Sequence, residues 1–314
     1  MSQIIHVAAA VIRDQQGKIL ITKRPDDKHQ GGKWEFPGGK REAGESIEAA
    51  LKRELYEELD IELIKADPLI KIQYNYPEYS VLLDVWQVHD FSGKACGKEG
   101  QEINWVELAE LQDYQFPEAN LPILTAIQLP DICLITPEPR YEANFLASLE
   151  TALKQGIRLV QFRAKELSNA DYMDLARQSI RLVHQYGGKI ILNSPPLWIK
   201  DADGMHLSSE ILQHTPYRPS IGKGKIITAA CHTQAELDKA AYIQVDAVFI
   251  SPVKPTTSHP KAEAIGWQGF QKLADNINVP AYALGGLDKN DLKTAKLHYA
   301  QGIAAISSIW EAVS

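Results

Sequence analysis

The chain has 314 residues, of which 45% are hydrophobic, so it is long enough to bury more than one core. Its formal net charge is −7, and lysine and arginine never run longer than a pair, which argues against a nucleic-acid polymer or an anionic membrane as the main partner. No apolar run reaches about 18 residues, and the N-terminal one is too short for a signal peptide. The cysteines lack CxxC spacing, so we expect free thiols in a reducing cytoplasm at Cys96, Cys133 and Cys231.

The first part of the chain combines short apolar strands with one clear helix. Strands are predicted at 4–12 and 18–24, on either side of the turn sequence DQQG, and together they look like a hairpin. Further strands are predicted at 80–88 and 102–108, and a weaker helical pattern follows Asn120. The clearest helix spans 46–59, where Ile47, Leu51, Leu55 and Leu59 form one apolar stripe.

This helix carries glutamates beside its apolar stripe. Glu54 and Glu58 lie at the edge of the stripe, and Glu57 is one step further round. Like charges four residues apart destabilise an isolated helix, whereas a divalent cation reverses that effect by binding several carboxylate oxygens. Carboxylates that hold Mg²⁺ against phosphate oxygens suit the attack of water on a pyrophosphate. The alternative is an ordinary solvated face that is rich in glutamate.

Beyond about residue 130 the pattern changes to apolar segments that alternate with amphipathic helices. The alternation predicts a parallel sheet, and eight such segments predict a closed (β/α)8 barrel, small for its class. We therefore expect an α/β protein with two domains, 1–130 and 131–314. The eight predicted strands lie at 131–136, 157–163, 189–193, 204–207, 226–232, 246–251, 280–286 and 302–307.

The spacing of the glutamates is more specific than their number. Gly39, five residues, Glu45, seven residues and then RELYEELDI from Arg53 resemble the Nudix box, G-x5-E-x7-R-E-U-x-E-E-x-G-U. One position departs, because Asp60 stands where the box has its last glycine, at the end of the helix. The segments ITKRPDDKH, WEFPGGK, GKEGQEINW and FPEANLP extend the resemblance over residues 4–128, to the MutT-type branch that hydrolyses oxidised guanine nucleotides. This resemblance implies an α/β/α sandwich with a mixed sheet.

The resemblance also implies roles for individual residues. Mg²⁺, with Mn²⁺ as a substitute, would be bound by the Gly38 carbonyl and by the carboxylates of Glu54, Glu57, Glu58 and Glu99. Glu54 or Glu99 would act as the general base, and Arg53 would orient the glutamates through ion pairs. The positions that contact the nucleotide in this branch correspond to Arg24, His29, Glu35, Phe36, Pro37, Gly38 and Asn120.

Several of these residues also have ordinary structural interpretations. Arg24 could be a surface strand residue, Phe36 a core residue, Glu99 a solvated loop residue and Asn120 a helix cap. The amide of Asn120 nevertheless presents a donor and an acceptor together, which suits the purine edge at O6 and N7. Oxidation at C8 turns N7 from an acceptor into a donor. Tyr79 stands where the branch often has an arginine on the phosphate side.

The second part of the chain resembles the thiamine phosphate synthase/TenI family. The motifs VQFRAK, TAACHTQAEL, ISPVKPTTSHP, YALGGL and IAAISSIW occur in the right order over about residues 131–313. The resemblance implies a phosphate cradle at Gly285–Gly286 and Ser307–Ser308, with Arg163 and Lys165 contacting pyrophosphate. His232 matches a position used for proton transfer by TenI-type thiazole tautomerases; the alternative is a strand-end histidine that the backbone satisfies.

The barrel also departs from the synthases. They have an acidic pair after the third strand, where this chain has Asn193, Ser194 and Pro195, and another Asp after the fourth, where it reads HLSSEIL. Without those carboxylates little would hold a Mg²⁺–pyrophosphate leaving group. We therefore expect a barrel that binds a small phosphorylated ligand without making thiamine phosphate.

These features together predict a Mg²⁺-dependent pyrophosphohydrolase whose partner is a free nucleotide, with 8-oxo-dGTP as the expected substrate and 8-oxo-dGMP and pyrophosphate as the products. Such an enzyme would clean the nucleotide pool and lower mutation. Another substrate, such as ADP-ribose or a thiamine-pathway pyrophosphate, remains an alternative. The barrel would then be a thiazole tautomerase or a non-catalytic phosphate-binding module.

Overall fold

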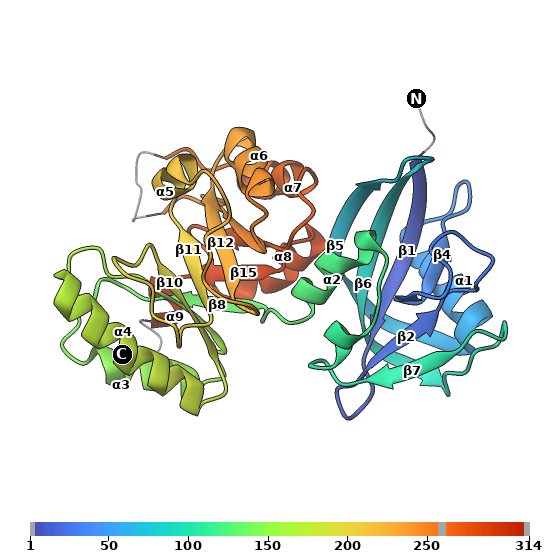
Figure 1. Ribbon diagram of the computed structural model, residues 1–314, viewed down its shortest axis with the longest axis horizontal. Coiled ribbons are helices and arrows are strands. Elements are labelled where there is room, and N and C mark those ends of the chain that lie inside the picture. The colour runs from blue at the N-terminus through green and yellow to red at the C-terminus, as the bar shows by residue number, and fades with distance from the viewer. Residues whose placement is uncertain (1–3, 257–261, 311–314) are drawn as a thin grey trace. The chain divides into compact units, whose positions relative to one another are not determined.

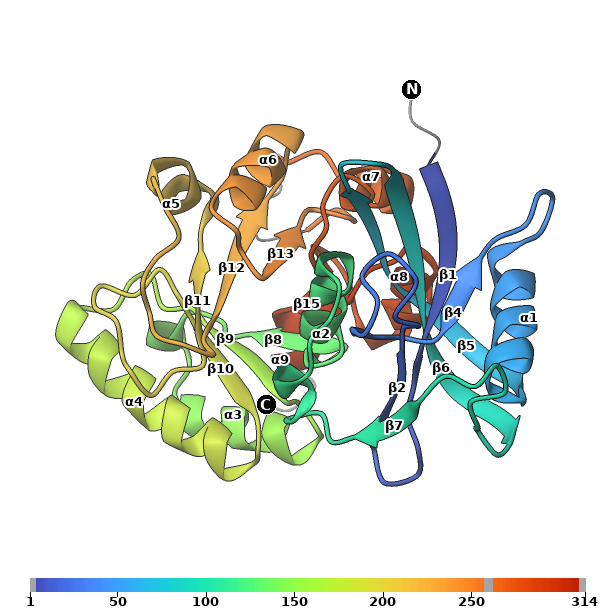
Figure 2. The same cartoon turned by 45° about the vertical axis from the view of Figure 1, so that its right-hand side comes forward.

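The computed structural model describes residues 4–256 and 262–310, which form two compact units, Met1–Gln128 and Leu129–Ser314 (Figures 1 and 2). The last part of the motif ISPVKPTTSHP, residues 257–260, lies outside the described residues. Over the described ranges no helix combines the length and the apolar character that crossing a membrane requires.

The first unit is built on two sheets. The larger sheet has the strand order β4-β1-β6-β5, with β1 parallel to β6 and antiparallel to β4, so it is mixed as predicted. The smaller sheet has the order β3-β2-β7 and is antiparallel. The strands are β1 (Ile4–Ile12), β2 (Ile19–Lys23), β3 (Trp34–Glu35), β4 (Gly38–Lys40), β5 (Ile61–Asn75), β6 (Ser80–Gly93) and β7 (Ile103–Val106).

The larger sheet has a helix on each face, because the side chains of β1 alternate between two cores. Ala8, Ala10 and Ile12 belong to the core that contains the leucines of α1 (Ile47–Leu59). Ala9 and Val11 belong to the core that contains Ile123 of α2 (Leu121–Ala126). This arrangement is the predicted α/β/α sandwich.

Helix α1 begins and ends through local interactions. Ser46 is its N-cap and accepts a hydrogen bond from the Ala49 nitrogen. Its buried stripe of Leu51, Leu55 and Leu59 has no exposed surface, and each leucine contributes about 2 kcal/mol by its burial. The helix ends at Asp60, whose φ of 58° is left-handed, and its carboxylate binds the Lys98 ammonium at 2.8 Å. The departure from glycine at this position therefore leaves the turn intact.

Two expectations for the first unit need correction. The turn after Asp14 forms, but the predicted hairpin is wrong, because only Arg13 and Ile19 form an antiparallel bridge. Both edges of β1 are occupied by β4 and β6, and β2 pairs with β3 and β7 instead. The long strand β5 was not predicted, because its sequence is interrupted by LysAlaAspPro at 65–68, where its register against β6 shifts.

The second unit is a closed barrel of eight parallel strands, in the order β8 to β15 with β15 beside β8, which confirms the predicted fold. Its strands are β8 (Ile132–Ile135), β9 (Leu159–Phe162), β10 (Lys189–Asn193), β11 (Gly204–Leu207), β12 (Ile226–Cys231), β13 (Ala247–Ile250), β14 (Ala281–Leu284) and β15 (Gly302–Ala305). The helices are α3 (Phe145–Lys154), α4 (Asn169–Gln185), α5 (Ser209–His214), α6 (Gln234–Tyr242), α7 (Gly266–Ala274), α8 (Leu292–Leu297) and α9 (Ser307–Trp310).

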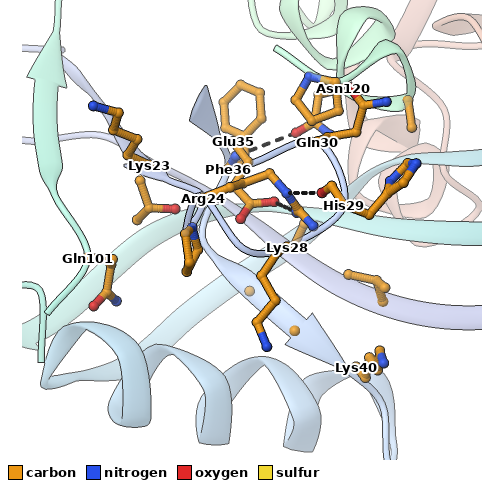
Figure 3. Close-up of a pocket in the computed structure, with 18 of the residues that line it drawn as sticks. Lys23, Arg24, Lys28, His29, Gln30, Glu35, Phe36, Lys40, Gln101 and Asn120 are labelled. Atoms are coloured by element: carbon orange, nitrogen blue, oxygen red, sulfur yellow. Dashed lines mark hydrogen bonds and ion pairs between the residues drawn. The ribbon is translucent and has the colours of Figure 1, made fainter. Parts of the chain in front are cut away.

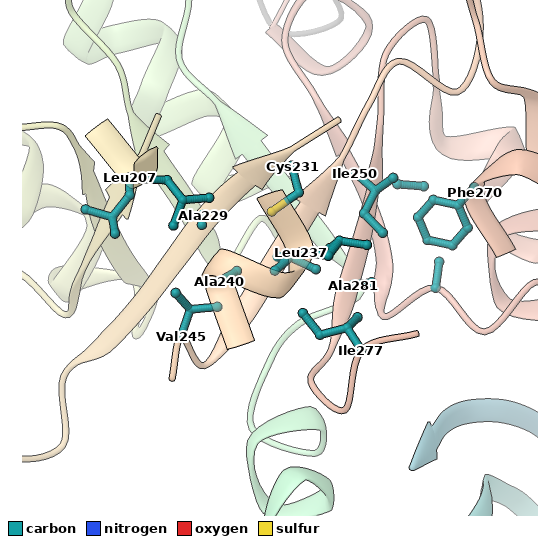
Figure 4. Packing of buried hydrophobic residues seen from close by; sticks show 14 of the residues in the cluster. Leu207, Ala229, Cys231, Leu237, Ala240, Val245, Ile250, Phe270, Ile277 and Ala281 are labelled. Carbon is teal, nitrogen blue, oxygen red and sulfur yellow. The ribbon is translucent and has the colours of Figure 1, made fainter. Parts of the chain in front are cut away.

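The barrel strands alternate their side chains between the interior and the helices. Leu159 of β9, Phe249 of β13 and Tyr282 of β14 pack into one interior cluster. Cys231 and Ile250 instead pack outward, in the cluster that includes residues of α6 and α7 (Figure 4). The carboxyl ends of all eight strands therefore meet at one rim, where the predicted barrel site residues lie.

Candidate active site

The first unit contains a cavity of about 830 Å³, a size that suits a nucleotide. It lies among β1, the loop that joins β2 to β3, β4, the β5–β6 hairpin and the turn before α2 (Figure 3). Its lining includes eight of the residues predicted from the sequence: Arg24, His29, Glu35, Phe36, Gly38, Glu58, Glu99 and Asn120. The structure describes Pro37, Arg53, Glu54 and Glu57 as well, but they do not belong to the lining.

Asn120 lies beside Phe36 at one end of the cavity. Its side chain is 8% exposed, and its Oδ1 accepts a long hydrogen bond of 3.5 Å from the Phe36 nitrogen. Within the described residues, the Asn120 side chain makes no capping hydrogen bond to α2, so the interpretation of this residue as a helix cap is wrong. The Phe36 ring is buried and stacks on Phe116 with 5.6 Å between centroids. Phe36 is thus both a core residue and part of the cavity wall.

Arg24 and Glu35 form a partly buried ion pair in the middle of the cavity. The Arg24 Nε also donates to the His29 carbonyl at 3.1 Å, so Arg24 is not an ordinary surface residue. Burial raises the pKa of Glu35, and the nearby Arg24 guanidinium opposes that shift. The ring of His29 contacts Tyr79, whose hydroxyl lies 3.0 Å from Nδ1 of the histidine.

Glu54 occupies the space beside Gly39. A Cβ atom at residue 39 would lie 2.2 Å from the Glu54 carboxyl carbon, so a larger residue there would force this carboxylate to move. The carboxylate is held by Arg53, whose Nη1 lies 2.8 Å from Glu54 Oε1 and 3.2 Å from Glu57 Oε2. Arg53 also binds both oxygens of Glu45, at 3.1 and 3.0 Å. One guanidinium thereby fixes three glutamates.

Glu58 reaches the cavity from the last turn of α1. Its Oε2 accepts a hydrogen bond of 3.1 Å from the Gly38 nitrogen. Burial raises the pKa of Glu58 to about 8, and repulsion from Glu35, Glu54 and Glu99 adds to the shift. The charge of Glu58 is therefore disfavoured both by its burial and by the neighbouring carboxylates.

The loop after β6 brings Glu99 to the same end of the cavity. The Lys98 nitrogen and the Gln101 side-chain amide both donate to the Glu58 carbonyl, at 2.9 and 2.8 Å. These bonds satisfy a carbonyl that the end of α1 leaves without a helical partner. The loop is therefore docked on the helix terminus next to the glutamates.

These glutamates are suited to a divalent metal ion, although they do not form a ready-made centre. No group of three His, Cys, Asp or Glu side chains in the described ranges is arranged to hold a metal. Glu57 is 51% exposed and paired with Arg53, so it would have to turn toward the others. The donor set nevertheless consists of hard oxygens, and a bound cation would offset both the burial and the repulsion that raise the pKa of Glu58. The residues therefore fit Mg²⁺.

Sequence reasoning missed several residues of this site. Tyr76, Lys28 and Gln101 line the cavity, and Glu45 fixes Arg53. Glu45 could have been found, since it is a fixed position of the box. The other three lie in loops or at a strand end, where no periodic pattern indicates which side chain faces a cavity.

The barrel rim brings together part of the predicted second site. Gly285 and Gly286 have φ of 104° and 63°, and a Cβ at Gly286 would lie 2.3 Å from the Pro255 carbonyl oxygen. Only glycine therefore fits at this turn. Ser308 donates to the Leu287 carbonyl at 2.7 Å, while Ser307 is exposed at the start of α9. Arg163 and Lys165 follow β9, and their backbone nitrogens bind Thr136 Oγ1 at 2.9 Å and Glu138 Oε2 at 2.7 Å.

His232 lies at the end of β12. Its Nδ1 is 2.8 Å from the Ser251 carbonyl oxygen, so this nitrogen carries a proton that it donates. In the neutral ring, Nε2 is then the unprotonated atom. The hydrogen bond to the Ser251 carbonyl agrees with the interpretation of His232 as a strand-end histidine that the backbone satisfies. The unprotonated Nε2 is also compatible with a role in proton transfer.

The positions that carry carboxylates in the synthases hold serines with structural roles. Ser194 has a φ of 43°, and its Oγ accepts a hydrogen bond of 3.3 Å from the Ser208 nitrogen. Ser208 caps α5 by accepting from the Ile211 nitrogen, and Ser209 donates to Glu236. These hydroxyls connect neighbouring loops of the rim.

Comparison with known families agrees with the two folds. The family described as "NUDIX domain" matches residues 8–126, and the family described as "Thiamine monophosphate synthase" matches residues 132–309. The chain therefore belongs to both families, to the Nudix family through its first unit and to the thiamine monophosphate synthase family through its second. The first unit is accordingly a Nudix hydrolase domain.

Individual relatives match one unit each. The 8-oxo-dGTP diphosphatase of Escherichia coli (strain K12) is 38% identical over 124 residues, covering 40% of this chain and 96% of the relative. That of Haemophilus influenzae is 41% identical over 122 residues, covering 39% and 90%. The thiamine-phosphate synthase of Streptococcus suis is 37% identical over 190 residues, covering 58% of this chain and 82% of the relative.

Proposed function

We propose that the protein is a Mg²⁺-dependent pyrophosphohydrolase that converts 8-oxo-dGTP into 8-oxo-dGMP and pyrophosphate, and so removes an oxidised precursor from the nucleotide pool. The observation that carries the proposal is the cavity itself. It has a buried amide, Asn120, at one end and the converging carboxylates Glu58 and Glu99 at the other. The similarity of the first unit to 8-oxo-dGTP diphosphatases supports this substrate.

The metal would be held by the Gly38 carbonyl and by Glu54, Glu57, Glu58 and Glu99, and Mn²⁺ would substitute for Mg²⁺. When bound, the ion would neutralise phosphate charge and make a bound water more acidic. This role accounts for a cluster of carboxylates that is otherwise unfavourable. This role of the metal also suits a free nucleotide as the substrate. We place the protein in the cytoplasm, because that substrate is found there.

The chain's own residues would position the water and take its proton. Glu54 is held by Arg53 beside the glycine strand, and either Glu54 or Glu99 would accept the proton as water attacks. A bond forms between the water oxygen and a phosphorus atom, and the bond that joins the monophosphate to the pyrophosphate breaks. Both products stay anionic, so cations must stabilise the departing charge.

The base would be recognised at the other end of the cavity. Asn120 presents an acceptor and a donor on one amide, and a purine that is oxidised at C8 has an acceptor at O6 beside a donor at N7. Unmodified guanine has acceptors at both positions, so one of its contacts with Asn120 is lost. Arg24, His29 and the Glu35–Gly38 backbone would complete the contacts to the nucleotide.

Replacing Asn120 by alanine is expected to reduce the preference for 8-oxo-dGTP over dGTP about tenfold. The loss of a buried hydrogen-bonding group costs about 1–3 kcal/mol, and it affects the oxidised base more. The measurement is kcat/KM for both nucleotides, with Asn104→Ala, which removes an amide that binds Tyr114 in the same unit, as the control. An equal loss for both nucleotides would mean that Asn120 does not read the base.

A fragment that ends near residue 130 is expected to fold and to hydrolyse 8-oxo-dGTP without the barrel. The buried cores that contain α1 and α2 consist of residues from 8 to 127 only, so the fragment keeps every core contact. Circular dichroism and the hydrolysis rate test this expectation. If the fragment were inactive or insoluble while the full chain is active, the barrel would be required and the proposed 1–130 domain would be wrong.

The most direct test of the substrate compares a panel of candidate compounds. Purified protein with Mg²⁺ is offered 8-oxo-dGTP, dGTP, ADP-ribose and a thiamine-pathway pyrophosphate, and kcat/KM is compared. The highest value is expected for 8-oxo-dGTP. A higher value for either of the last two would replace the proposed substrate and keep the Nudix chemistry.

For the barrel we propose a phosphate-binding role. Backbone amides at Gly285–Gly286 and the hydroxyl of Ser307 can bind a phosphate group without a metal. The unprotonated Nε2 of His232 favours tautomerisation of a thiazole phosphate as a second candidate activity. Replacing His232 by glutamine would abolish the tautomerase activity but would leave phosphate binding unchanged. Calorimetry would measure the binding.

A further inference from the structure

The cavity of the first unit has two chemically different ends. Asn120 and Phe36 define one end, while Gly38, Glu58 and Glu99 lie at the other. If the base binds beside the amide, as in the proposed function on which this inference rests, the phosphate chain extends toward the glutamates. A triphosphate there meets several carboxylates, so it needs cations from the protein as well as from a metal.

Two of the lysine and arginine side chains along the cavity are already engaged. Arg24 is paired with Glu35, and Lys23 lies 3.2 Å from Glu102. The ammonium of Lys28, like that of Lys40, forms no hydrogen bond or ion pair in the parts of the chain that the structure describes, although both residues line the cavity. The Lys28 side chain runs from its loop toward β4 and α1, away from Asn120 (Figure 3).

The loop that carries Lys28, residues 25–32, is held in place from both sides. At its base the Arg24 nitrogen bonds to the Lys33 carbonyl at 2.9 Å, and the Gly32 nitrogen bonds to the Arg24 carbonyl at 3.1 Å. At its tip, His29 packs edge-on against Tyr76 and Tyr79, with ring centroids 5.0 and 5.4 Å away. Because His29 follows Lys28 directly, this contact with the β5–β6 hairpin also fixes the position of the Lys28 backbone.

We propose that Lys28 binds the phosphate chain of the nucleotide. Its ammonium, carried by a loop that the aromatic contact holds in place, supplies a positive charge near Gly38 and Glu58. Lys28 is therefore a substrate-positioning residue that acts on the phosphates and not on the base. Lys40 also lines the cavity, but it lies at the end of β4 and not on the loop that His29 anchors.

The test replaces Lys28 by methionine, which keeps the aliphatic stem and removes the charge. KM for 8-oxo-dGTP is expected to rise about tenfold, because one charge-assisted contact is lost. Inhibition by the nucleoside 8-oxo-deoxyguanosine, which has no phosphate, is expected to change less than twofold. The dependence of KM on salt should weaken in the variant. Lys28→Arg should restore most of the affinity, and Lys65→Met, an exposed lysine on β5 outside the cavity, is the matched control.

Three outcomes would overturn the proposal: an unchanged KM, an equal loss of affinity for the nucleoside, or a failure of arginine to restore binding. Calorimetry with inorganic tripolyphosphate and Mg²⁺ separates this proposal from the proposed function. A tenfold weaker binding of tripolyphosphate in Lys28→Met supports the role of Lys28 even if the wild-type protein prefers another nucleotide. Equal binding by both proteins refutes it, whichever substrate the panel identifies.

Discussion

Replacing Glu58 by glutamine is expected to lower kcat for 8-oxo-dGTP by about a thousandfold while the fold stays intact. Glutamine keeps an oxygen that can accept the hydrogen bond from the Gly38 nitrogen, but it removes the negative charge that a divalent ion requires. Because burial already makes this charge unfavourable in the absence of a metal, the variant should unfold at a temperature at least as high as the wild-type protein does.

The measurements are steady-state kinetics at saturating Mg²⁺ and thermal unfolding by circular dichroism. Glu48→Gln is the matched control, since Glu48 is exposed in the first turn of the same helix. Turnover near the wild-type value in Glu58→Gln would refute the metal assignment. A loss of similar size in Glu48→Gln would instead point to a general effect of charge on the helix.

The barrel is expected to form no thiamine phosphate at an enzymatic rate from the pyrimidine pyrophosphate, the thiazole phosphate and Mg²⁺. That reaction expels pyrophosphate, and the departing charge needs a metal that carboxylates hold. Ser194, Pro195, Ser208 and Ser209 occupy these places, and the serine hydroxyls are used in structural hydrogen bonds. Neutral hydroxyls are poor substitutes for carboxylates.

The assay compares this protein with a thiamine-phosphate synthase under the same conditions and detects the product by chromatography. Comparable rates would show that the chain performs the reaction by other groups. Calorimetry with the thiazole phosphate tests the second half of the expectation, which is that a phosphorylated ligand still binds. No heat of binding would contradict it.

Patterns that repeat along the chain were the most predictable part of this structure. The leucines of α1 and the eight apolar segments of the barrel have a clear period, because each side chain must face a core. Strand pairing was less predictable. One partner of β1 is β6, where Ile4 pairs with Ser80 far along the chain, and no local pattern encodes that pairing.

The site residues were also predictable where they lie on a periodic element and unpredictable where they lie in loops. The glutamates of α1 stand at fixed spacings on one helix, so their position on one side of it could be anticipated from the sequence. Lys28 and Tyr76 lie in connections between strands, where the direction of a side chain depends on contacts with distant segments. The sequence left the role of Asn120 open between a cap and a ligand contact, and the missing hydrogen bond to α2 argues against the cap, while the ligand contact stays a prediction.

The closure of the barrel has a consequence for the order of folding during synthesis. Because β8 pairs with β15, the ring cannot close until the strand at 302–305 has left the ribosome. The Nudix unit, by contrast, has all its strands and helices once residue 126 has emerged. The hydrolase half can therefore reach its native state while most of the barrel is still being translated, and a stalled ribosome would carry a folded enzyme attached to an open sheet.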